Sequence, residues 1–166
     1  KTPSSYCGEE NMTIETEIIL SHWKNGVPDD RIAHLIKDAT RALVRSLQNE
    51  LKKYGVPFSQ WAILRVLWTQ DGLSQRELSS MAGTMESTTA NVVRQMEKKG
   101  YILRRHLGKN KRKRHVFLTL KGRKLEKKLV PLAEEVNKKA RKNIAQEEIK
   151  LLHNCLLTMI ANLGSE

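Results

Sequence analysis

The feature that most constrains the fold of this chain is a pair of short apolar runs separated by a very basic tip. The runs cover residues 101–107 and 115–120, and the seven residues Gly108–Arg114 between them include five Lys or Arg and no acid. Two short apolar runs joined by a polar segment that contains glycine are typical of a β-hairpin. We therefore expect a small hairpin with a strongly cationic tip.

The positive charge of the chain is concentrated around this hairpin. The stretch from Lys98 to Lys128 holds fourteen Lys or Arg and one acid, Glu126, whereas the whole chain has a net charge of +12. The remaining residues are therefore close to neutral. Lys and Arg side chains that displace counterions provide most of the sequence-independent affinity for duplex DNA. A tip without interspersed acids repels itself unless an anion binds, so nucleic acid is favoured over a merely solvated hairpin.

Two short helices are expected just before the hairpin. Ser74 and Glu77 have the spacing of a capping box at the start of a helix over Gln75–Met81, and Gly83 ends that helix. A second helix is expected over Met85–Lys99. Two short helices joined by a tight turn form a helix-turn-helix, and a following basic hairpin makes it a winged helix that reads double-stranded DNA.

The second of these helices has a polar side suited to base recognition. Thr89, Met96 and one of the two valines between them share a face and are expected in the core. Asn and Gln pair naturally with adenine and Arg with guanine, although an ordinary solvated helix face is the alternative. The residues expected to contact DNA are Ser87, Thr88, Asn91, Arg94, Gln95 and Lys98 of this helix, Ser74, Gln75 and Arg76 of the preceding one, and Lys109, Asn110, Lys111, Arg112, Lys113 and Arg114 of the wing.

Long amphipathic helices are expected on both sides of the winged helix. Apolar residues recur every three or four positions over residues 32–54, over 125–144 with Pro131 inside, and over 149–163. A small winged helix cannot cover all these stripes, so we expect a homodimer, with a self-contained bundle as the alternative. The residues expected in the dimer interface are Ile32, Leu35, Ile149, Leu152, Leu156, Met159, Ile160 and Leu163.

The fold class expected from these patterns is mainly α with a small β-hairpin wing. Residues 1–28 are interpreted as an N-terminal tail with a short helix, 57–119 as the DNA-binding winged helix-turn-helix, and 29–56 with 120–163 as a helical dimerisation region. Two cysteines provide no disulfide framework, which favours a reducing cytosol, and Cys155 is expected to be buried beside the last apolar stripe. No apolar run reaches the ~20 residues of a membrane span.

The sequence has no pattern that favours catalysis. None of the five histidines forms an i, i+4 pair, and there is no CxxC, phosphate loop or nucleophile elbow. We therefore expect no enzyme activity, no metal and no cofactor. Candidate residues for a pocket that binds a small aromatic acid are His34, Trp61, Arg65 and Trp68, because an aromatic wall with a cation suits a carboxylate. The alternative for the two tryptophans is the core.

The ordered set of motifs resembles the MarR family of bacterial winged-helix transcriptional regulators. The segments that carry the resemblance are Gln60–Leu64, Gln75–Leu78, Ser87–Asn91, Glu97–Ile102 and Leu118–Gly122, within residues 30–163. The resemblance implies a cytoplasmic, nucleoid-associated homodimer whose first and last two helices intertwine, with each winged helix reading one half-site of a near-palindrome. Family members commonly repress their own promoter and release it when a small ligand, often an aromatic acid, binds.

The wing departs from the family pattern at one point. The family usually carries Asp-Arg-Arg where this chain has Asn110, Lys111 and Arg112. The Asp normally orients an Arg through a salt bridge, whereas Asn110 lacks the charge and Lys111 lacks the planar fork. This wing is therefore expected to bind phosphates more generally, although Lys111 and Arg112 remain the best candidates for a minor-groove contact. The alternative function is a winged helix that binds nucleic acid nonspecifically, as an architectural or RNA-binding protein.

Overall fold

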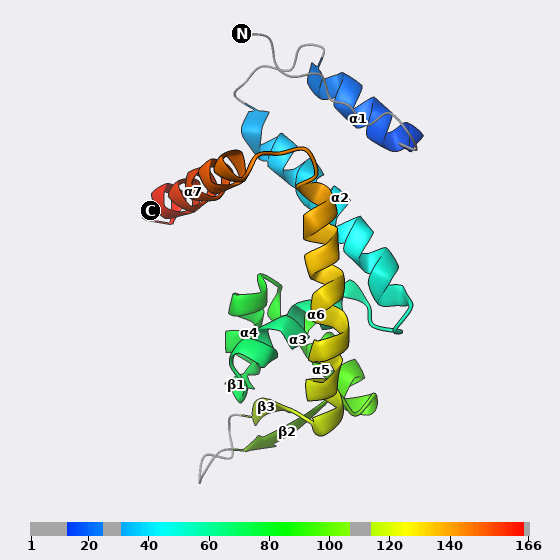
Figure 1. Cartoon of the computed structure of the whole chain (residues 1–166). Helices are drawn as coiled ribbons and strands as arrows, with labels where there is room; N and C mark the ends of the chain where they lie inside the picture. The colour runs from blue at the N-terminus through cyan, green and yellow to red at the C-terminus, as the bar shows by residue number, and fades with distance from the viewer. Residues whose placement is uncertain (1–12, 25–30, 107–113, 165–166) are drawn as a thin grey trace. The chain divides into compact units, whose positions relative to one another are not determined.

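The computed structural model describes residues 13–24, 31–106 and 114–164 (Figure 1). The helices are α1 (Ile14–Lys24), α2 (Ile32–Lys52), α3 (Phe58–Thr69), α4 (Gln75–Ala82), α5 (Glu86–Lys98), α6 (Leu120–Ala140) and α7 (Gln146–Leu163). The strands β1 (Leu73–Ser74), β2 (Ile102–His106) and β3 (Arg114–Leu118) form one antiparallel sheet in the order β1-β3-β2. The predicted fold class, mainly helical with a small wing, is confirmed.

The chain forms two compact units, residues 1–42 and 43–166, so the division falls inside α2. In the first unit the indole N–H of Trp23 in α1 donates to the carboxylate of Asp38 in α2 over 3.2 Å. The short helix expected near the N-terminus is therefore present. The functional division into a DNA-binding domain and a dimerisation region stays a prediction, because a compact unit is defined by packing and not by a bound partner.

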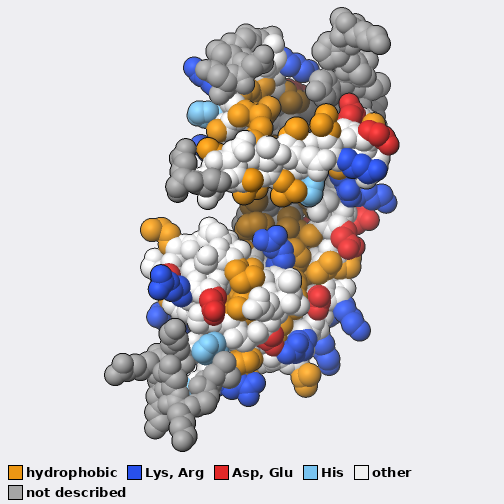
Figure 2. All heavy atoms as spheres, turned by 90° about the vertical axis from the view of Figure 1, so that its left-hand side faces the viewer, with side chains coloured by type: hydrophobic (Ala, Val, Ile, Leu, Met, Phe, Trp, Pro, Cys, Tyr) orange, Lys and Arg blue, Asp and Glu red, His pale blue; other side chains and the backbone are white. Residues whose placement is uncertain are grey.

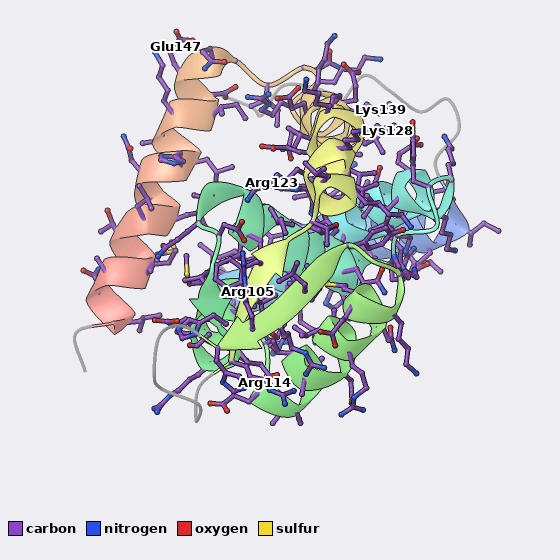
Figure 3. The ribbon with its side chains drawn as sticks, turned by 90° about the horizontal axis from the view of Figure 1, so that it is seen from below. Arg105, Arg114, Arg123, Lys128, Lys139 and Glu147 are labelled. Atoms are coloured by element: carbon purple, nitrogen blue, oxygen red, sulfur yellow. The ribbon has the colours of Figure 1, made fainter. Side chains whose placement is uncertain are left out.

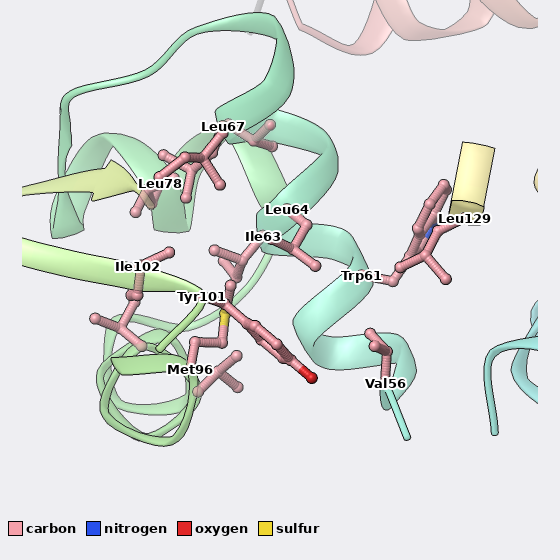
Figure 4. Close-up of a cluster of buried hydrophobic side chains, with 14 of the residues drawn as sticks. Val56, Trp61, Ile63, Leu64, Leu67, Leu78, Met96, Tyr101, Ile102 and Leu129 are labelled. Atoms are coloured by element: carbon pink, nitrogen blue, oxygen red, sulfur yellow. The ribbon is translucent and has the colours of Figure 1, made fainter. Parts of the chain in front are cut away.

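The core of the second unit is built around α3. This helix carries an almost continuous apolar sequence from Trp61 to Trp68, so it can be covered on several sides by α4, α5, α6 and the sheet. The two indole rings meet edge to face with their centres 5.5 Å apart. Leu51 is fully buried in this unit. The other large side chains that are buried most completely are Ile63, Leu64, Leu67, Leu78, Met96, Ile102 and Leu129 (Figure 4).

The third strand, β1, was not expected from the sequence. Leu73 and Ser74 pair with Val116 and His115 of β3. Two residues are too few to show the alternation of apolar and polar positions that marks a strand. The hairpin is thus anchored to the loop that follows α3, in addition to its own antiparallel pairing.

The start of α6 approaches the sheet closely at Gly122. The hydroxyl of Thr119, the N-cap residue, accepts from the Gly122 amide over 3.1 Å and donates to the Gly100 carbonyl over 2.6 Å. The indole N–H of Trp68 donates to the Gly122 carbonyl over 3.1 Å. A Cβ at Gly122 would collide with the carbonyl oxygen of Tyr101. The absence of a side chain here lets α3, the sheet and α6 meet.

The two ends of the chain expose large apolar side chains. No residue of α7 is buried, and Leu152, Ile160 and Leu163 are 53%, 68% and 73% exposed (Figure 2). The other residues expected in a dimer interface, Ile32, Leu35, Ile149, Leu156 and Met159, are exposed or half-buried. Cys155 is exposed too, so the expectation of burial is wrong for the single chain, because within one chain no residue of α7 is buried, the apolar stripe included.

We predict that Gly122→Ala lowers the free energy of unfolding by about 1–3 kcal/mol, the usual cost of inserting atoms into a packed interior. Denaturation in urea would measure the change. Glu126→Ala, at an exposed position of the same helix, is the control and should stay within about 0.5 kcal/mol of the original protein. Equal stability of the two variants would show that the close approach at Gly122 is not needed.

Candidate nucleic-acid interface

The interface begins with α4, whose first turn is closed by the predicted capping box. The Ser74 hydroxyl accepts from the Glu77 amide over 3.3 Å, and the Glu77 carboxylate accepts from the Ser74 amide over 2.7 Å. The same hydroxyl donates to the Glu77 carboxylate over 2.6 Å. Ser74 therefore has a structural role at the cap. Of the other residues predicted to contact DNA here, Gln75 is half-buried and Arg76 is exposed.

A tight turn sets α5 against α4. Gly83 adopts the left-handed conformation (φ +63°) that ends α4, which a side chain would strain. The hydroxyls of Thr84 and Thr89 then hydrogen-bond over 2.8 Å, and Thr89 is buried. This contact satisfies a buried hydroxyl and fixes the first turn of α5 to the turn that precedes it.

The helix α5 separates a buried face from an exposed one. Its buried residues are Thr89, Val92, Val93 and Met96, which confirms the predicted core face and adds the second valine. The six residues predicted to contact DNA are all exposed: Ser87, Thr88, Asn91, Arg94, Gln95 and Lys98. None of these six is acidic, so they can approach a phosphate backbone without like-charge repulsion. An exposed acid of α5, Glu86, lies in its first turn, 3.9 Å from Nε of Arg76.

A buried glutamine of α3, Gln60, hydrogen-bonds to two residues at the C-terminal end of α5. Gln60 of α3 donates through Nε2 to Oε1 of Gln95 over 3.4 Å, and its own Oε1 accepts from Nζ of Lys99 over 3.1 Å. Lys99 also donates to the Gly55 carbonyl over 2.9 Å. On the surface of α5, Arg94 approaches Asn91, with Nη1 3.4 Å from Oδ1. The sequence analysis used Gln60 only as part of the segment Gln60–Leu64 that carries the family resemblance, and no local pattern indicated its contacts with Gln95 and Lys99.

An ion pair joins the wing to α5. Arg104 of β2 donates through Nε and Nη2 to one carboxylate oxygen of Glu97 over 3.1 and 2.5 Å. The hydrogen bonds from Arg104 lower the pKa of Glu97, and Glu97 in turn raises the pKa of Arg104. The pair therefore stays ionised at neutral pH and holds β2 against the end of α5.

The outer side of the hairpin carries a second ordered arginine. The guanidinium of Arg105 lies 4.4 Å from the centre of the Phe117 ring, a cation–π geometry that restricts the arginine side chain. Arg114, the one predicted wing residue within the described part of the chain, is exposed at the start of β3 (Figure 3). The other predicted wing residues, 109–113, lie outside the described residues. Arg105 belongs to the apolar run of the sequence and was missed.

The loop after α3 fixes the base of the wing. One oxygen of Asp71 accepts from the amides of Gly72 and Leu118 over 3.0 and 2.9 Å, and the other pairs with Nη2 of Arg123 over 2.5 Å. Asp71 therefore connects α3, β3 and α6. Its partners are forty-seven and fifty-two positions away for Leu118 and Arg123, so no local pattern could have revealed this role.

The four residues considered for a ligand pocket have different surroundings. Trp61 is buried in the core and Trp68 is half-buried, with its N–H bonded to Gly122. Arg65 is exposed on α3, and His34 is exposed in the first compact unit. A shared pocket for these residues stays a prediction.

Two features of the described residues concern other classes of function. No helix there is both long enough and apolar enough to cross a membrane. No cluster of three or more His, Cys, Asp or Glu side chains in these ranges could hold a metal ion.

Comparisons with known proteins agree on one family. The model of the MarR family matches residues 57–113. Transcriptional regulator HosA from Escherichia coli O157:H7 is 30% identical over 104 residues, which is 63% of this chain and 76% of that protein. The crystal structure of a MarR transcriptional regulator from Methanosarcina mazei Go1 is 26% identical, with a TM-score of 0.74 over 86% of this chain and 96% of that one. BpsR from Bordetella bronchiseptica, whose DNA binding is regulated by 6-hydroxynicotinic acid, is 22% identical, with a TM-score of 0.72 over 78% of this chain and 98% of that one.

We predict a pH-dependent effect of Glu97→Gln. The pKa of Glu97 lies below its ordinary 4.5, so the ion pair with Arg104 stabilises the fold above that pH and is lost as the pH falls through the folded-state pKa. Because the pair is partly exposed to solvent, the variant should lose no more than about 1 kcal/mol at pH 7. Unfolding free energies at pH 7 and pH 3 measure this difference.

The control for that experiment is Glu134→Gln, at an exposed position of α6 without an ion pair among the described residues. It should match the original protein at both pH values. A deficit of Glu97→Gln that persists at pH 3 would show that packing, and not ionisation, is responsible.

Proposed function

Because this chain belongs to the MarR family of DNA-binding transcriptional regulators, we propose that it recognises a near-palindromic operator as a homodimer and represses the genes beside it. The observation that carries this proposal is the exposed polar face of α5 formed by Ser87, Thr88, Asn91, Arg94, Gln95 and Lys98, which backs onto a buried core face. A rigid helix with short polar residues at its N-terminal end can enter the major groove and reach base edges.

The proposed contacts divide into base recognition and phosphate binding. Asn91 suits adenine and Arg94 suits guanine, since both can form two hydrogen bonds with the major-groove edge of those bases. Arg105 and Arg114 are exposed cations that suit phosphates on either side. Arg76 is exposed too, but its Nε lies 3.9 Å from the carboxylate of Glu86, so it would have to exchange that partner for a phosphate. The wing residues 109–113 add further positive charge.

The exposed apolar side chains support a homodimer. Leu152, Ile160 and Leu163 of α7 lie open to solvent in one chain, and a second copy is the simplest way to bury them. A two-fold symmetric protein would place its two α5 helices in major grooves about one helical turn apart. The operator would then be a near-palindrome.

A small aromatic acid is the proposed effector. The support comes from BpsR, which shares the fold and whose DNA binding is regulated by 6-hydroxynicotinic acid. Such a ligand would relieve repression by favouring a dimer geometry that no longer fits the operator. We propose a cytoplasmic location with association to the nucleoid in the DNA-bound state, since the operator is there.

The alternative function is nonspecific binding of nucleic acid. It is favoured by Asn110 and Lys111, which replace the family's Asp-Arg and should reduce discrimination by the wing. An architectural or RNA-binding protein would use the same positive charge without reading bases.

Selection from fragmented genomic DNA separates these functions. The purified protein would be incubated with the fragments at about 0.15 M salt, and the bound fraction sequenced. A recurring near-palindrome with half-site centres about one helical turn apart is the expected result. Uniform recovery that collapses as salt increases would instead establish nonspecific binding.

We predict that Arg94→Ala costs about 1–3 kcal/mol of binding to the selected operator and relaxes the preference at a single base pair of each half-site. Titration of a set of operators with one base changed in turn would measure both effects. Arg141→Ala removes the same charge from an exposed position after α6 and is the matched control. If both variants bind every operator equally well, Arg94 does not read a base.

The wing is tested by reversing its central charges. We predict that Lys111→Glu with Arg112→Glu abolishes operator binding, because two cations become anions beside the phosphate backbone. The control, Lys138→Glu with Lys139→Glu, makes the same change in net charge at exposed positions of α6. Unaltered affinity of the wing variant in a gel-shift titration would overturn the assignment of the wing.

A further inference from the structure

Four exposed lysines near the start of α6 have no part in the function proposed above. Lys121, Lys124, Lys127 and Lys128 lie on its first three turns, and we call this group the basic ridge. Residues three, four and seven apart share one side of a helix, so the ridge forms a continuous cationic strip. It is separate from the polar face of α5 and from the wing.

The ridge begins where α5 ends. Nζ of Lys121 donates to the carbonyl of Lys99 over 2.8 Å and lies 5.0 Å from the centre of the Tyr101 ring. Nζ of Lys99 lies 5.8 Å from the same ring. The ammonium groups of Lys99 and Lys121 thus both lie near the Tyr101 ring. The positive charge at the end of α5 therefore continues onto the start of α6.

The charge of the ridge is not neutralised by its surroundings. Among the described residues, none of Lys124, Lys127 and Lys128 forms an ion pair. The one acid on these turns, Glu126, lies two positions from both Lys124 and Lys128. Residues two apart project about 200° from each other around a helix, so the Glu126 side chain points away from those of Lys124 and Lys128.

The distal half of α6 differs in this respect. Lys138 pairs with Glu135 over 3.9 Å. The pKa of Glu50 is lowered mainly by its hydrogen bond from Lys53, with a smaller contribution from the charge of Lys139. Lys128 and Lys139 project from the same side of α6 (Figure 3), and of these two only Lys139 is among the charges that lower the pKa of Glu50. The uncompensated charge is therefore confined to the half of α6 next to the sheet and α5.

We propose that the basic ridge binds the phosphates of DNA that flanks the operator half-site. The occupant is a polyanion because the strip is purely cationic, and duplex DNA is the polyanion that this family binds. From Lys121 to Lys128 the helix rises about 10 Å, which matches about three phosphates of one strand at 3.4 Å per nucleotide along the duplex axis. The polar face of α5 and the wing already occupy the half-site, so the ridge is left to contact DNA beyond it.

This inference rests on the proposed function, since it needs an operator as the reference position. It predicts a footprint longer than the two half-sites and an affinity that depends on duplex length. An acidic protein partner would fit the same charge, but would produce no dependence on the length of the DNA.

The test compares two duplexes centred on the selected operator. One duplex of about 18 bp just covers both half-sites, and the other extends by about 10 bp, one helical turn, on each side. The variant is Lys124→Gln with Lys127→Gln and Lys128→Gln, which removes three charges while keeping helix-forming side chains. The matched control is Lys138→Gln, Lys139→Gln and Lys142→Gln, at exposed positions with the same loss of charge.

We expect the ridge variant to bind the long duplex about tenfold or more weakly at 0.15 M salt. Its salt slope should be smaller by about 5, because the dimer loses up to six phosphate contacts, three from each protomer. Its binding to the short duplex should equal that of the original protein. The control should behave like the original protein on both duplexes. Circular dichroism and sedimentation would show that both variants retain the fold and oligomeric state.

Two results would overturn the proposal. Equal loss on both duplexes would place the ridge on the half-site itself, and no loss on either would show that the ridge does not bind DNA. If the original protein selects no operator, the proposed function fails separately. The ridge is then tested on a random duplex of the longer length, where a reduced salt slope supports phosphate binding and an unchanged slope refutes it.

Discussion

The close approach of α6 to the sheet at Gly122 is the constraint on which the rest of the second unit depends. Any side chain there would meet the carbonyl oxygen of Tyr101, and the hydrogen bond from the Trp68 indole would be lost with the displaced backbone. Because α6 starts directly after β3, its direction is set at this contact. The position of the wing and the direction of the long helix are therefore decided together.

Polar contacts extend this constraint to the wing and α5, where we propose that DNA binds. Asp71 holds β3 and Arg123 of α6, while the pair of Arg104 with Glu97 holds β2 to α5. A displacement of α6 would thus be transmitted to the wing, and a displacement of the wing to α5. This arrangement offers a physical route by which an effector that alters the dimer could alter DNA binding, as we propose.

The described cations of this framework fall into two groups, those paired with acids and those without an acidic partner. The cations of Arg104 and Arg123 are paired and structural, whereas those of the α5 face, Arg105 and the basic ridge are free of acidic partners in the described residues. Paired cations contribute little to binding a polyanion because their charge is already neutralised. The net charge of the basic stretch therefore overstates the number of groups available to DNA, and the structure identifies which ones remain.

The sequence by itself determined the helices, the capping box, the hairpin and the exposed polar face of α5, because each depends on neighbours within about one or two helical turns. Only the tertiary structure revealed β1, the support of Gln95 by Gln60 and the junction at Asp71, whose partners are tens of residues away. It also decided which cations are paired and which remain open. Local patterns specify which face of an element is apolar, whereas contacts between distant segments exist only after those faces have packed.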